Sequence, residues 1–349
     1  DLGSYKVFSD FQNSFNEFAL KFPYRFSHVM RSVDCTGDNI INSKNIKNSF
    51  DIYGETEDSK YLIHAVGIKD SYDIYGGGMA SLIYEGIDTG LQGSEQLFSV
   101  LNHTCFQTFY TYMCYDSRNL FGCIGMRSKQ YCILNKQYAK EEYFELVPKI
   151  IKQMNTMPYI DKKEIIYKYG EFFPSELSPF AYNETIAQEY FPKEKKEIIK
   201  NGYNYRESPE KDYQTTIKSE NLPDHIKDIS ESIIDEIIAC PNNGSVLTGC
   251  TQAYRIIKPE LDFLKNNNIA LPRYCPNCRH YKRLKQRNPF KLWHAKCKCV
   301  GSNYKNEKYK NTIEHIHGDK LCSNEFETSY APNRPEIIYC EKCYQQEVY

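Results

Sequence analysis

The chain has 349 residues, with 44 Lys and Arg side chains against 45 Asp and Glu, 14 cysteines and a mean hydropathy of −0.63. Its formal net charge of −1 excludes a wholly basic nucleic-acid binder, and the lack of an apolar run of about 20 residues excludes a membrane-spanning helix. We therefore expect two or three domains and no membrane partner. No signal-peptide pattern opens the chain, and because it begins at Asp1 rather than at Met, we expect an upstream piece to be missing.

The N-terminal segment, 1–33, contains a regular series of phenylalanines. Five of them follow one another at steps of three or four positions: Phe8, Phe11, Phe15, Phe18 and Phe22. This spacing places side chains on one face of an α-helix. Pro23 comes next, and proline clashes with a preceding helical turn. We predict an amphipathic N-terminal helix within residues 1–33 that ends near Pro23.

Short, similar units recur from residue 34 to residue 138. Three of them are Asn48-Ser-Phe-Asp-Ile-Tyr-Gly54, Asp70-Ser-Tyr-Asp-Ile-Tyr-Gly76 and Asp116-Ser-Arg-Asn-Leu-Phe-Gly122. Each unit joins a polar turn to a few β-forming residues and cannot bury its apolar side alone, so stacking is the natural solution. Units step by ten to twelve positions, and two of them would make a coil of about 20 residues. We interpret residues 34–140 as a short parallel β-solenoid, with an antiparallel β-sandwich as the alternative.

Four cysteines in this segment recur at every ninth position: Cys105, Cys114, Cys123 and Cys132. In a solenoid we expect them to point inward and to stack as a ladder. Free cysteine is commonly a small buried hydrophobe, so we favour that role over a metal site. His64 and His103 are isolated in sequence, and we expect them to be packed or exposed rather than catalytic.

Residues 141–230 are expected to connect the solenoid to the C-terminal region. The stretch 141–168 predicts a helix, in which Pro148 and Pro158 mark breaks or first-turn positions. Residues 170–225 are polar and interrupted by prolines, including Pro209, yet they are rich in Phe and Tyr. Because a disordered linker is poor in aromatic residues, we predict an extended connector that lies across neighbouring domains.

Two C-x-x-C pairs in residues 231–349 point to metal. Cys275-Pro-Asn-Cys278 and Cys340-Glu-Lys-Cys343 have the spacing that lets two thiolates reach one tetrahedral zinc ion. Cys240 and Cys250 lie upstream of the first pair and complete a four-cysteine structural site. A helix that starts at Pro259 is expected between the two halves of this site.

The second C-x-x-C pair has more candidate partners. Two of Cys297, Cys299 and Cys322 would complete its ligand set, with a histidine in place of one cysteine as the alternative: His294, His315 or His317. A closed four-ligand shell leaves no open coordination position, so we predict two structural zinc ions and no metal catalysis. Thiol-rich metal sites fit a reducing compartment, which favours the cytoplasm.

Several longer motifs resemble a known group of proteins. They are Asn119-Leu-Phe-Gly-Cys-Ile-Gly125, Tyr131-Cys-Ile-Leu-Asn-Lys-Gln-Tyr138, Ser178-Pro-Phe-Ala-Tyr-Asn-Glu-Thr185, Cys275-Pro-Asn-Cys-Arg-His280, Arg287-Asn-Pro-Phe-Lys-Leu-Trp293 and Ser329-Tyr-Ala-Pro-Asn-Arg-Pro-Glu-Ile-Ile-Tyr-Cys-Glu-Lys-Cys343. These motifs are similar to an uncharacterised family of cysteine-rich zinc-ribbon proteins common in candidate-phyla bacteria. The resemblance spans nearly the whole chain and implies paired C-terminal zinc knuckles, but it brings no known activity.

The same resemblance narrows the second ligand set. In shorter family members a compact C-x-x-C precedes the segment that matches Thr328-Ser-Tyr-Ala-Pro332. Alignment on that segment implies Cys297 and Cys322 as the partners of the last C-x-x-C pair, with Cys299 as the alternative. Many members carry a further upstream zinc ribbon that this chain lacks.

Positive charge is concentrated in residues 263–306, which contain eleven Lys and Arg and no Asp or Glu. The rest of the chain therefore carries 44 − 11 = 33 positive against 45 negative side chains, or −12. Cations among aromatic rings suit phosphates and unstacked bases. The candidate nucleic-acid-binding residues are Arg273, Arg279, Lys282, Arg283, Lys285, Arg287, Lys291 and Trp293. Contact with protein, or charge balance for the zinc thiolates, are the alternatives.

We therefore expect a mainly β protein with helices, ending in a double zinc-ribbon or treble-clef module. Its predicted function is that of a non-enzymatic scaffold, with the basic zinc module on nucleic acid or ribonucleoprotein and the solenoid on protein. The first alternative is a subunit of a particle or filament, stapled by zinc. The second alternative is a carbohydrate-active enzyme that uses solenoid carboxylates: Asp70, Asp73, Glu85 and Asp88.

Overall fold

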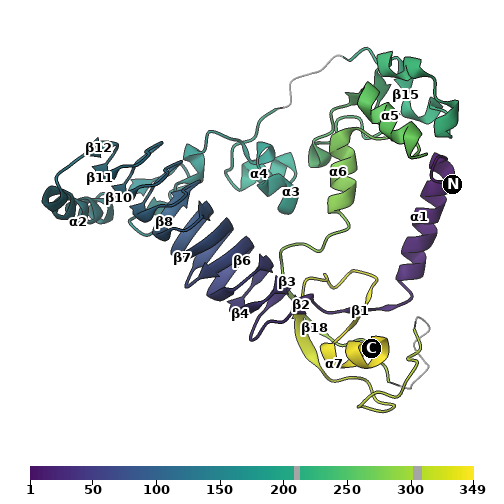
Figure 1. Cartoon of the computed structure of the whole chain (residues 1–349), viewed down its shortest axis with the longest axis horizontal. Coiled ribbons are helices and arrows are strands. Elements are labelled where there is room, and N and C mark those ends of the chain that lie inside the picture. Colours follow the sequence, from purple (N-terminus) through teal and green to yellow (C-terminus); the bar gives the residue numbers. More distant parts are fainter. Residues whose placement is uncertain (208–212, 302–308) are drawn as a thin grey trace.

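The computed structural model describes residues 1–207, 213–301 and 309–349; Pro209 of the predicted connector and Lys305 of the basic segment lie outside these ranges. The protein is mainly β, as predicted, with a long solenoid and cysteine-rich regions at its other end (Figure 1). Among the helices of the described ranges, none combines the length and apolar character that a bilayer crossing requires.

Seven α-helices lie within the described ranges: α1 (Tyr5–Ala19), α2 (Lys140–Thr156), α3 (Ala187–Tyr190), α4 (Lys195–Lys200), α5 (Lys258–Asn266), α6 (Pro276–Leu284) and α7 (Glu341–Val348). The solenoid strands are β2 (Val29–Met30), β3 (Gly37–Ile41), β4 (Ser43–Lys47), β5 (Ser49–Tyr53), β6 (Thr56–Lys69), β7 (Tyr72–Gly90), β8 (Ser94–Val100), β9 (Phe106–Phe109), β10 (Arg118–Phe121), β11 (Gln130–Ile133) and β12 (Lys136–Gln137). The remaining strands are β1 (Pro23–Arg25), β13 (Tyr159–Ile160), β14 (Ile166–Tyr167), β15 (Ile217–Lys218), β16 (Ile238–Ala239), β17 (Ala253–Tyr254), β18 (Trp293–Lys296), β19 (Glu325–Thr328) and β20 (Ile337–Tyr339).

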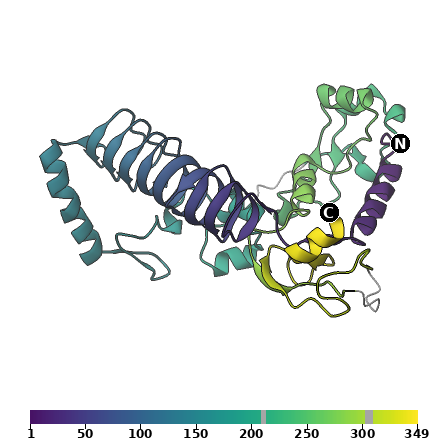
Figure 2. The same cartoon turned by 60° about the horizontal axis from the view of Figure 1, so that its bottom comes forward.

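The solenoid strands from β2 to β11 pair in parallel, which confirms the solenoid over the sandwich (Figure 2). The register gives the coil length. Phe106 pairs with Arg118 and Arg118 with Gln130, each a step of twelve positions, whereas Phe50 pairs with Ile63, a step of thirteen. The predicted coil of about 20 residues is therefore wrong. A single sequence unit makes a whole coil, rather than half of one.

The wall of the solenoid turns at every third residue. In the first coils, left-handed backbone conformations with φ near +50° recur at Asn39, Asn42, Asn45, Asn48 and Asp51. The residue after each of these corners points inward and is buried: Ile40, Ser43, Ile46, Ser49 and Ile52. Asn and Asp tolerate this conformation better than other non-glycine residues. A twelve-position step with three positions per side gives four sides, so each coil is a narrow four-sided turn.

The four regularly spaced cysteines point inward, as predicted. Cys105, Cys114, Cys123 and Cys132 are all 0 % exposed. Each of the first three donates its thiol hydrogen to the backbone carbonyl of the next, at Sγ–O distances of 3.3, 3.6 and 3.4 Å. Burial raises the pKa of the Cys105 and Cys123 thiols to about 11. They are therefore protonated donors at neutral pH, which suits a packed ladder.

Helix α2 closes one end of the solenoid. Tyr143 of α2 is buried against Phe121 and Ile133 of the last two coils. The helix ends at Thr156, so the prediction of a helix through residue 168 is wrong; β13 and β14 form a short hairpin instead. Pro158 disfavours helical backbone in the residue before it. Pro148 lies inside α2 without breaking it, because the helix is packed on both sides of that position.

The opposite end of the solenoid meets the C-terminal region. The first strand, β1, pairs in parallel with β20, so residues 23–25 and 337–339 lie side by side. Asp38 of β3 accepts hydrogen bonds from the Ser329 hydroxyl and from His28, whose Nδ1 and backbone nitrogen lie 3.0 and 2.7 Å from Oδ1. These contacts fix the C-terminal region on the first coils.

The His28–Asp38 pair predicts a pH dependence. The hydrogen bond to Asp38 raises the pKa of His28, while the bonds from His28 and Ser329 outweigh burial and lower the pKa of Asp38 to about 2. Because the pKa of His28 is higher in the folded state, its contribution is present below pH 6.5 and is lost as pH rises through the raised value. We expect the Tm difference between wild type and Asp38→Asn to shrink from pH 6 to pH 8. A difference that is constant over this range would contradict the pairing.

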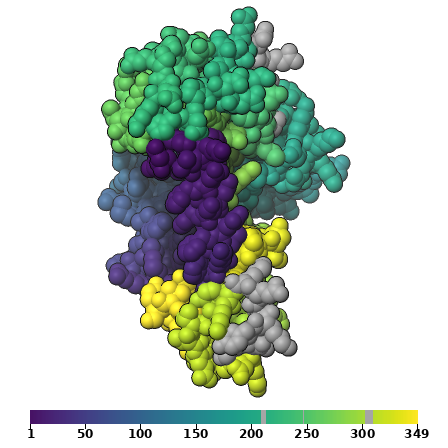
Figure 3. Space-filling view, turned by 90° about the vertical axis from the view of Figure 1, so that its right-hand side faces the viewer, coloured from purple at the N-terminus to yellow at the C-terminus, as the bar shows by residue number. Residues whose placement is uncertain are grey.

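Helix α1 confirms the predicted N-terminal helix, but its apolar face is not covered. No residue of α1 is buried. Its N-terminal end contacts the region of α5, where the Ile226 and Ala270 amides donate to the Gly3 and Leu2 carbonyls, and its C-terminal end leads into β1. Figure 3 shows α1 crossing the surface between the two cysteine-rich regions. The exposed fractions of Phe11, Phe15 and Phe18 are 64, 57 and 56 %.

Candidate metal centres

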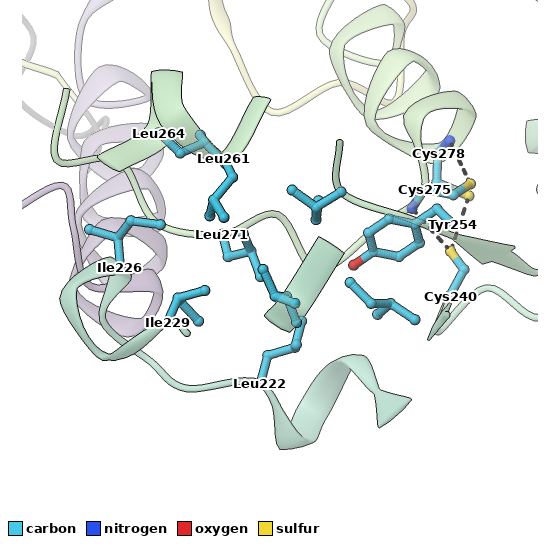
Figure 4. Close-up of a cluster of buried hydrophobic side chains, with 13 residues drawn as sticks. Leu222, Ile226, Ile229, Cys240, Tyr254, Leu261, Leu264, Leu271, Cys275 and Cys278 are labelled. Carbon is cyan, nitrogen blue, oxygen red and sulfur yellow. Dashed lines mark hydrogen bonds between the residues drawn. The ribbon is translucent and has the colours of Figure 1, made fainter. Parts of the chain in front are cut away.

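The first predicted cysteine group is assembled by three short elements. Cys240 follows β16, Cys250 follows a 3₁₀ turn (Val246–Thr248), and Cys275 and Cys278 lie at the start of α6. The four sulfur atoms all lie within 4.8 Å of one another. We call this set site A. Figure 4 shows three of these cysteines, Cys240, Cys275 and Cys278, beside a cluster of apolar side chains that includes Tyr254, Leu261 and Leu271.

Backbone amides point at the sulfurs of site A. The Cys275 amide donates to Cys240 Sγ at 3.4 Å and the Cys278 amide to Cys275 Sγ at 3.5 Å. Burial raises the pKa of the Cys275 thiol, but hydrogen bonds from Thr251 and Cys278 outweigh it, so the net pKa lies below its usual range. Cys275 also caps the N-terminus of α6, where the helix dipole favours negative charge. Burial raises the pKa of the Cys240 and Cys278 thiols instead, so the fold stabilises the thiolate of Cys275 in particular.

The second cysteine group lies between three strands and the last helix. Cys297 follows β18, Cys322 precedes β19, Cys340 follows β20 and Cys343 lies in α7. All four are buried and their sulfurs lie within 4.8 Å of one another. We call this set site B. The Cys340 amide donates to Cys297 Sγ and the Asn324 side chain to Cys340 Sγ, both at 3.2 Å.

The sulfur separations fit a tetrahedral ion. Cys240 and Cys278 lie 3.8 Å apart in site A, Cys250 and Cys275 4.0 Å apart, and Cys322 and Cys340 3.9 Å apart in site B. Two thiolates bound at about 2.3 Å from one tetrahedral zinc ion are separated by about 3.8 Å. Both sets could therefore hold a metal ion without rearrangement of the chain.

Three of the residues considered as alternative ligands of site B lie in a third group of their own. They do not replace a cysteine of site B. Cys299 lies with His315, His317 and Cys343, and their ligand atoms lie within 4.8 Å of one another. Cys343 is therefore common to both groups. His294 lies elsewhere, on β18, where its ring nitrogens contact Glu325 and Glu327. Sequence spacing alone did not separate these roles.

Three of the predicted nucleic-acid-binding residues make contacts within the protein. Arg273 is buried and donates to the Ser219 and Pro223 carbonyls at 3.0 and 2.8 Å. Arg279 pairs with Glu260 of α5 at 2.9 Å. Arg287 pairs with Asp51 of β5 at 2.7 Å and lies over the Phe290 ring. The first two stabilise the region of site A, and the third joins the basic segment to the solenoid.

The remaining predicted cations face solvent. Lys282, Arg283 and Lys285 are exposed at the C-terminal end of α6, and none of them forms an ion pair with another described residue. Lys291 is exposed as well, and its ammonium lies 5.3 Å from the centre of the half-buried Trp293 ring. These five residues form one chain segment between sites A and B.

Two of the four solenoid carboxylates considered for sugar cleavage lie together. Asp73 and Glu85 occupy equivalent corners of successive coils, and both line a hollow of about 330 Å³ with Tyr61 and Phe172. Burial raises the pKa of both carboxyl groups. Asp70 and Asp88 occupy other corners and do not line this hollow.

The two histidines of the solenoid segment are packed, as expected. His64 lies between Asp51 and Tyr190, at 3.2 Å from each, and His103 packs edge-on against Tyr115. The His64 ring also packs against Phe290, so it helps to hold the connector and the basic segment on the solenoid.

No protein-family model, curated protein or solved structure matches the chain, and the resemblance to a cysteine-rich family stays a prediction from its motifs.

Proposed function

We propose that this protein is a non-enzymatic scaffold that zinc stabilises and that contacts nucleic acid through the segment between sites A and B. The observation that carries the proposal is the row of exposed cations without carboxylate partners among the described residues: Lys282, Arg283, Lys285 and Lys291. Phosphate groups are the natural counter-ions of such a row, and the Trp293 ring beside Lys291 offers a face for an unstacked base. This combination favours single strands and RNA loops.

Zinc is the metal that the ligand chemistry favours. Four thiolates at tetrahedral separations are typical of structural zinc sites, which keep all four positions closed. Thiolate ligands also require a reducing environment, and we propose a cytoplasmic location for that reason. The charge-balance alternative applies best to Arg273 and Arg279, which lie in the region of site A. Charge balance accounts less well for Lys282, Arg283 and Lys285, whose side chains are exposed to solvent.

The solenoid is proposed to bind protein rather than nucleic acid. Tyr53 and Val66 are register partners on neighbouring coils, and their exposed fractions are 44 and 46 %. Exposed apolar and aromatic side chains of this kind suit a protein partner.

The nucleic-acid proposal predicts salt-dependent binding that the α6 cations control. We expect the triple variant Lys282→Ala, Arg283→Ala, Lys285→Ala to weaken binding to a labelled single-stranded RNA. The slope of log K against log salt should fall by about two, because three phosphate contacts are lost at about 0.7 each. Fluorescence anisotropy at several salt concentrations measures both quantities.

The matched control removes three exposed lysines at the other end of the solenoid: Lys129, Lys140 and Lys152. It should bind RNA like wild type. Absence of binding at low salt, or equal weakening by both triple variants, would contradict the proposal. Arg287 is left unchanged in this test, since its substitution would also break the ion pair with Asp51.

A second function, self-assembly, is favoured by the uncovered face of α1. Five phenylalanines lie on this helix and the turn after it, with exposed fractions between 41 and 64 %. An apolar stripe of this kind is self-complementary across a two-fold axis, so the partner that we propose is a second copy of the chain. Sedimentation velocity should then show an oligomer that Phe11→Asp disrupts.

Asn13→Asp is the control for this test, since it adds the same charge about 200° around the helix. If wild type is a monomer at every concentration tested, or if both variants assemble equally well, the α1 face is not an interface between copies.

A further inference from the structure

We propose that the C-terminal region holds two metal ions rather than one, with the Cys343 thiolate bridging them. Site B would bind the first zinc ion. The second would be bound by Cys299, His315, His317 and Cys343, a set that we call site C. All four ligand atoms of site C lie within 4.8 Å of one another. This inference goes beyond the proposed function, which assigns one ion each to sites A and B.

His315 is oriented as a metal ligand. Its side chain is fully buried, with Nε2 2.9 Å from an oxygen of Glu347, whose side chain is also 0 % exposed. Nε2 therefore carries the proton and donates it to the carboxylate. This leaves the lone pair of Nδ1 directed at the site, 3.2 Å from Cys299 Sγ. A carboxylate behind a histidine is the usual arrangement at zinc sites, because it fixes the tautomer and strengthens the ligand.

His317 is also oriented as a metal ligand, but in this residue Nε2 rather than Nδ1 faces the site. Nδ1 lies 2.7 Å from the Lys320 carbonyl, so it carries the proton. The lone pair of Nε2 is directed at Cys343 Sγ, at 3.3 Å. The two imidazoles thus present acceptor nitrogens toward two sulfurs from opposite tautomers. A pair of histidines that served packing alone would not need both lone pairs to converge on the same small volume.

Cys299, the cysteine that belongs to site C alone, accepts a hydrogen bond from a buried side chain. Asn311 is buried and donates from Nδ2 to Cys299 Sγ at 3.2 Å. The Asn311 side-chain oxygen in turn accepts a hydrogen bond from the Tyr339 hydroxyl at 2.7 Å. Asn324 makes the equivalent contact to Cys340 of site B. Amide donors of this kind stabilise thiolates, so the two halves of the cluster are built alike.

Charge also favours two ions. One Zn²⁺ with four thiolates leaves −2 in site B. Adding Cys299 as a thiolate and a second Zn²⁺ changes this to −1, because one negative and two positive charges are added. Buried charge is costly unless it is compensated, so the second ion lowers the cost of the first. Five thiolates and two neutral imidazoles then supply four ligands to each ion, with Cys343 counted twice.

Metal content of the full chain tests the proposal directly. We expect three zinc ions per chain by elemental analysis, and two in His317→Ala. Cys275→Ser should also contain two, but it loses the ion of site A. The two variants are distinguished after exchange into ¹¹³Cd²⁺. Wild type should give three cadmium resonances, of which two are split by mutual coupling through the shared sulfur.

His317→Ala should lose one resonance of the coupled pair and the splitting of the other, whereas Cys275→Ser should lose the uncoupled resonance. In the zinc-loaded wild type, ¹⁵N–¹H spectra should show His315 protonated on Nε2 and His317 on Nδ1. Two zinc ions in wild type, three uncoupled cadmium resonances, or an imidazolium at either histidine would overturn the proposal. The wild-type measurements need no variant, and RNA binding is not among the readouts, so this result is independent of the proposed function.

Discussion

A chelator is expected to unfold both cysteine-rich regions while the solenoid stays folded. Sites A and B lie inside the two C-terminal apolar clusters, whose buried or partly buried residues include all eight predicted cysteine ligands. Structural zinc contributes about 10–16 kcal/mol of apparent binding free energy, which is comparable with or larger than the whole stability of a typical domain, about 5–15 kcal/mol. The solenoid instead buries isoleucines, serines and protonated cysteines. Its stability should not depend on zinc.

Hydrogen exchange measured by mass spectrometry would show this division. After chelation, peptides from residues 231–301 and 309–349 should exchange fast, and peptides from β5 to β11 should stay protected. Cys275→Ser should reproduce the effect around site A, whereas Cys123→Ser, an equally buried cysteine of the solenoid, should not release metal. Protection of the C-terminal peptides after complete metal removal would show that zinc is not the main stabilising element there.

The solenoid was predictable as a class, but its coil length was not. Ser59 and Ser71 are twelve positions apart and Cys105 and Cys114 nine, and both steps are multiples of the three-residue side. Ser49 and Ser59 are only ten apart because one extra residue is inserted between Ile52 and Thr56. This irregular step obscured the period of three. Several left-handed corners also lie at residue types that rarely adopt this conformation, such as Tyr61, Leu82 and Phe98, so composition alone does not mark them as corners.

Half of each four-cysteine group could be predicted because C-x-x-C is a local pattern, whereas the contacts of the basic residues depend on distant partners. Arg287 pairs with Asp51, 236 positions away, and nothing near it in sequence indicates this. Cys299 had one available signal. In the extended segment Cys297-Lys-Cys299, the two cysteines are separated by a single residue, which is too short a loop for the two-residue knuckle that C-x-x-C provides. The structure places them in different ligand groups.

Removal of one complete coil is expected to lower the stability of the solenoid only a little, whereas removal of one residue fewer should lower it more. Deleting residues 118–129 joins Ser117 to Gln130. The register then lets Gln130, Cys132 and Ile133 take over the β9 partners of the strand that is lost, because β10 and β11 occupy equivalent positions. Helix α2 keeps its contact with Ile133 of the last coil. In a repeat structure each coil contacts only its neighbours, so stability should fall by little more than the share of one coil.

Deleting residues 119–129 instead shifts the last strand by one position. Tyr131 would then occupy the inward place of Leu120, and Ile133 the left-handed corner of Gly122, whose φ is +64°. Overpacking costs about 1–3 kcal/mol, and the docking of α2 is lost as well. A non-glycine residue occupies this left-handed corner in both deletions, because Leu134 takes the place of Gly122 when the complete coil is removed. Urea unfolding should therefore place the shorter deletion at least about 1 kcal/mol below the complete-coil deletion, although it removes less of the chain. Equal stabilities would mean that the three-residue corner does not set the register.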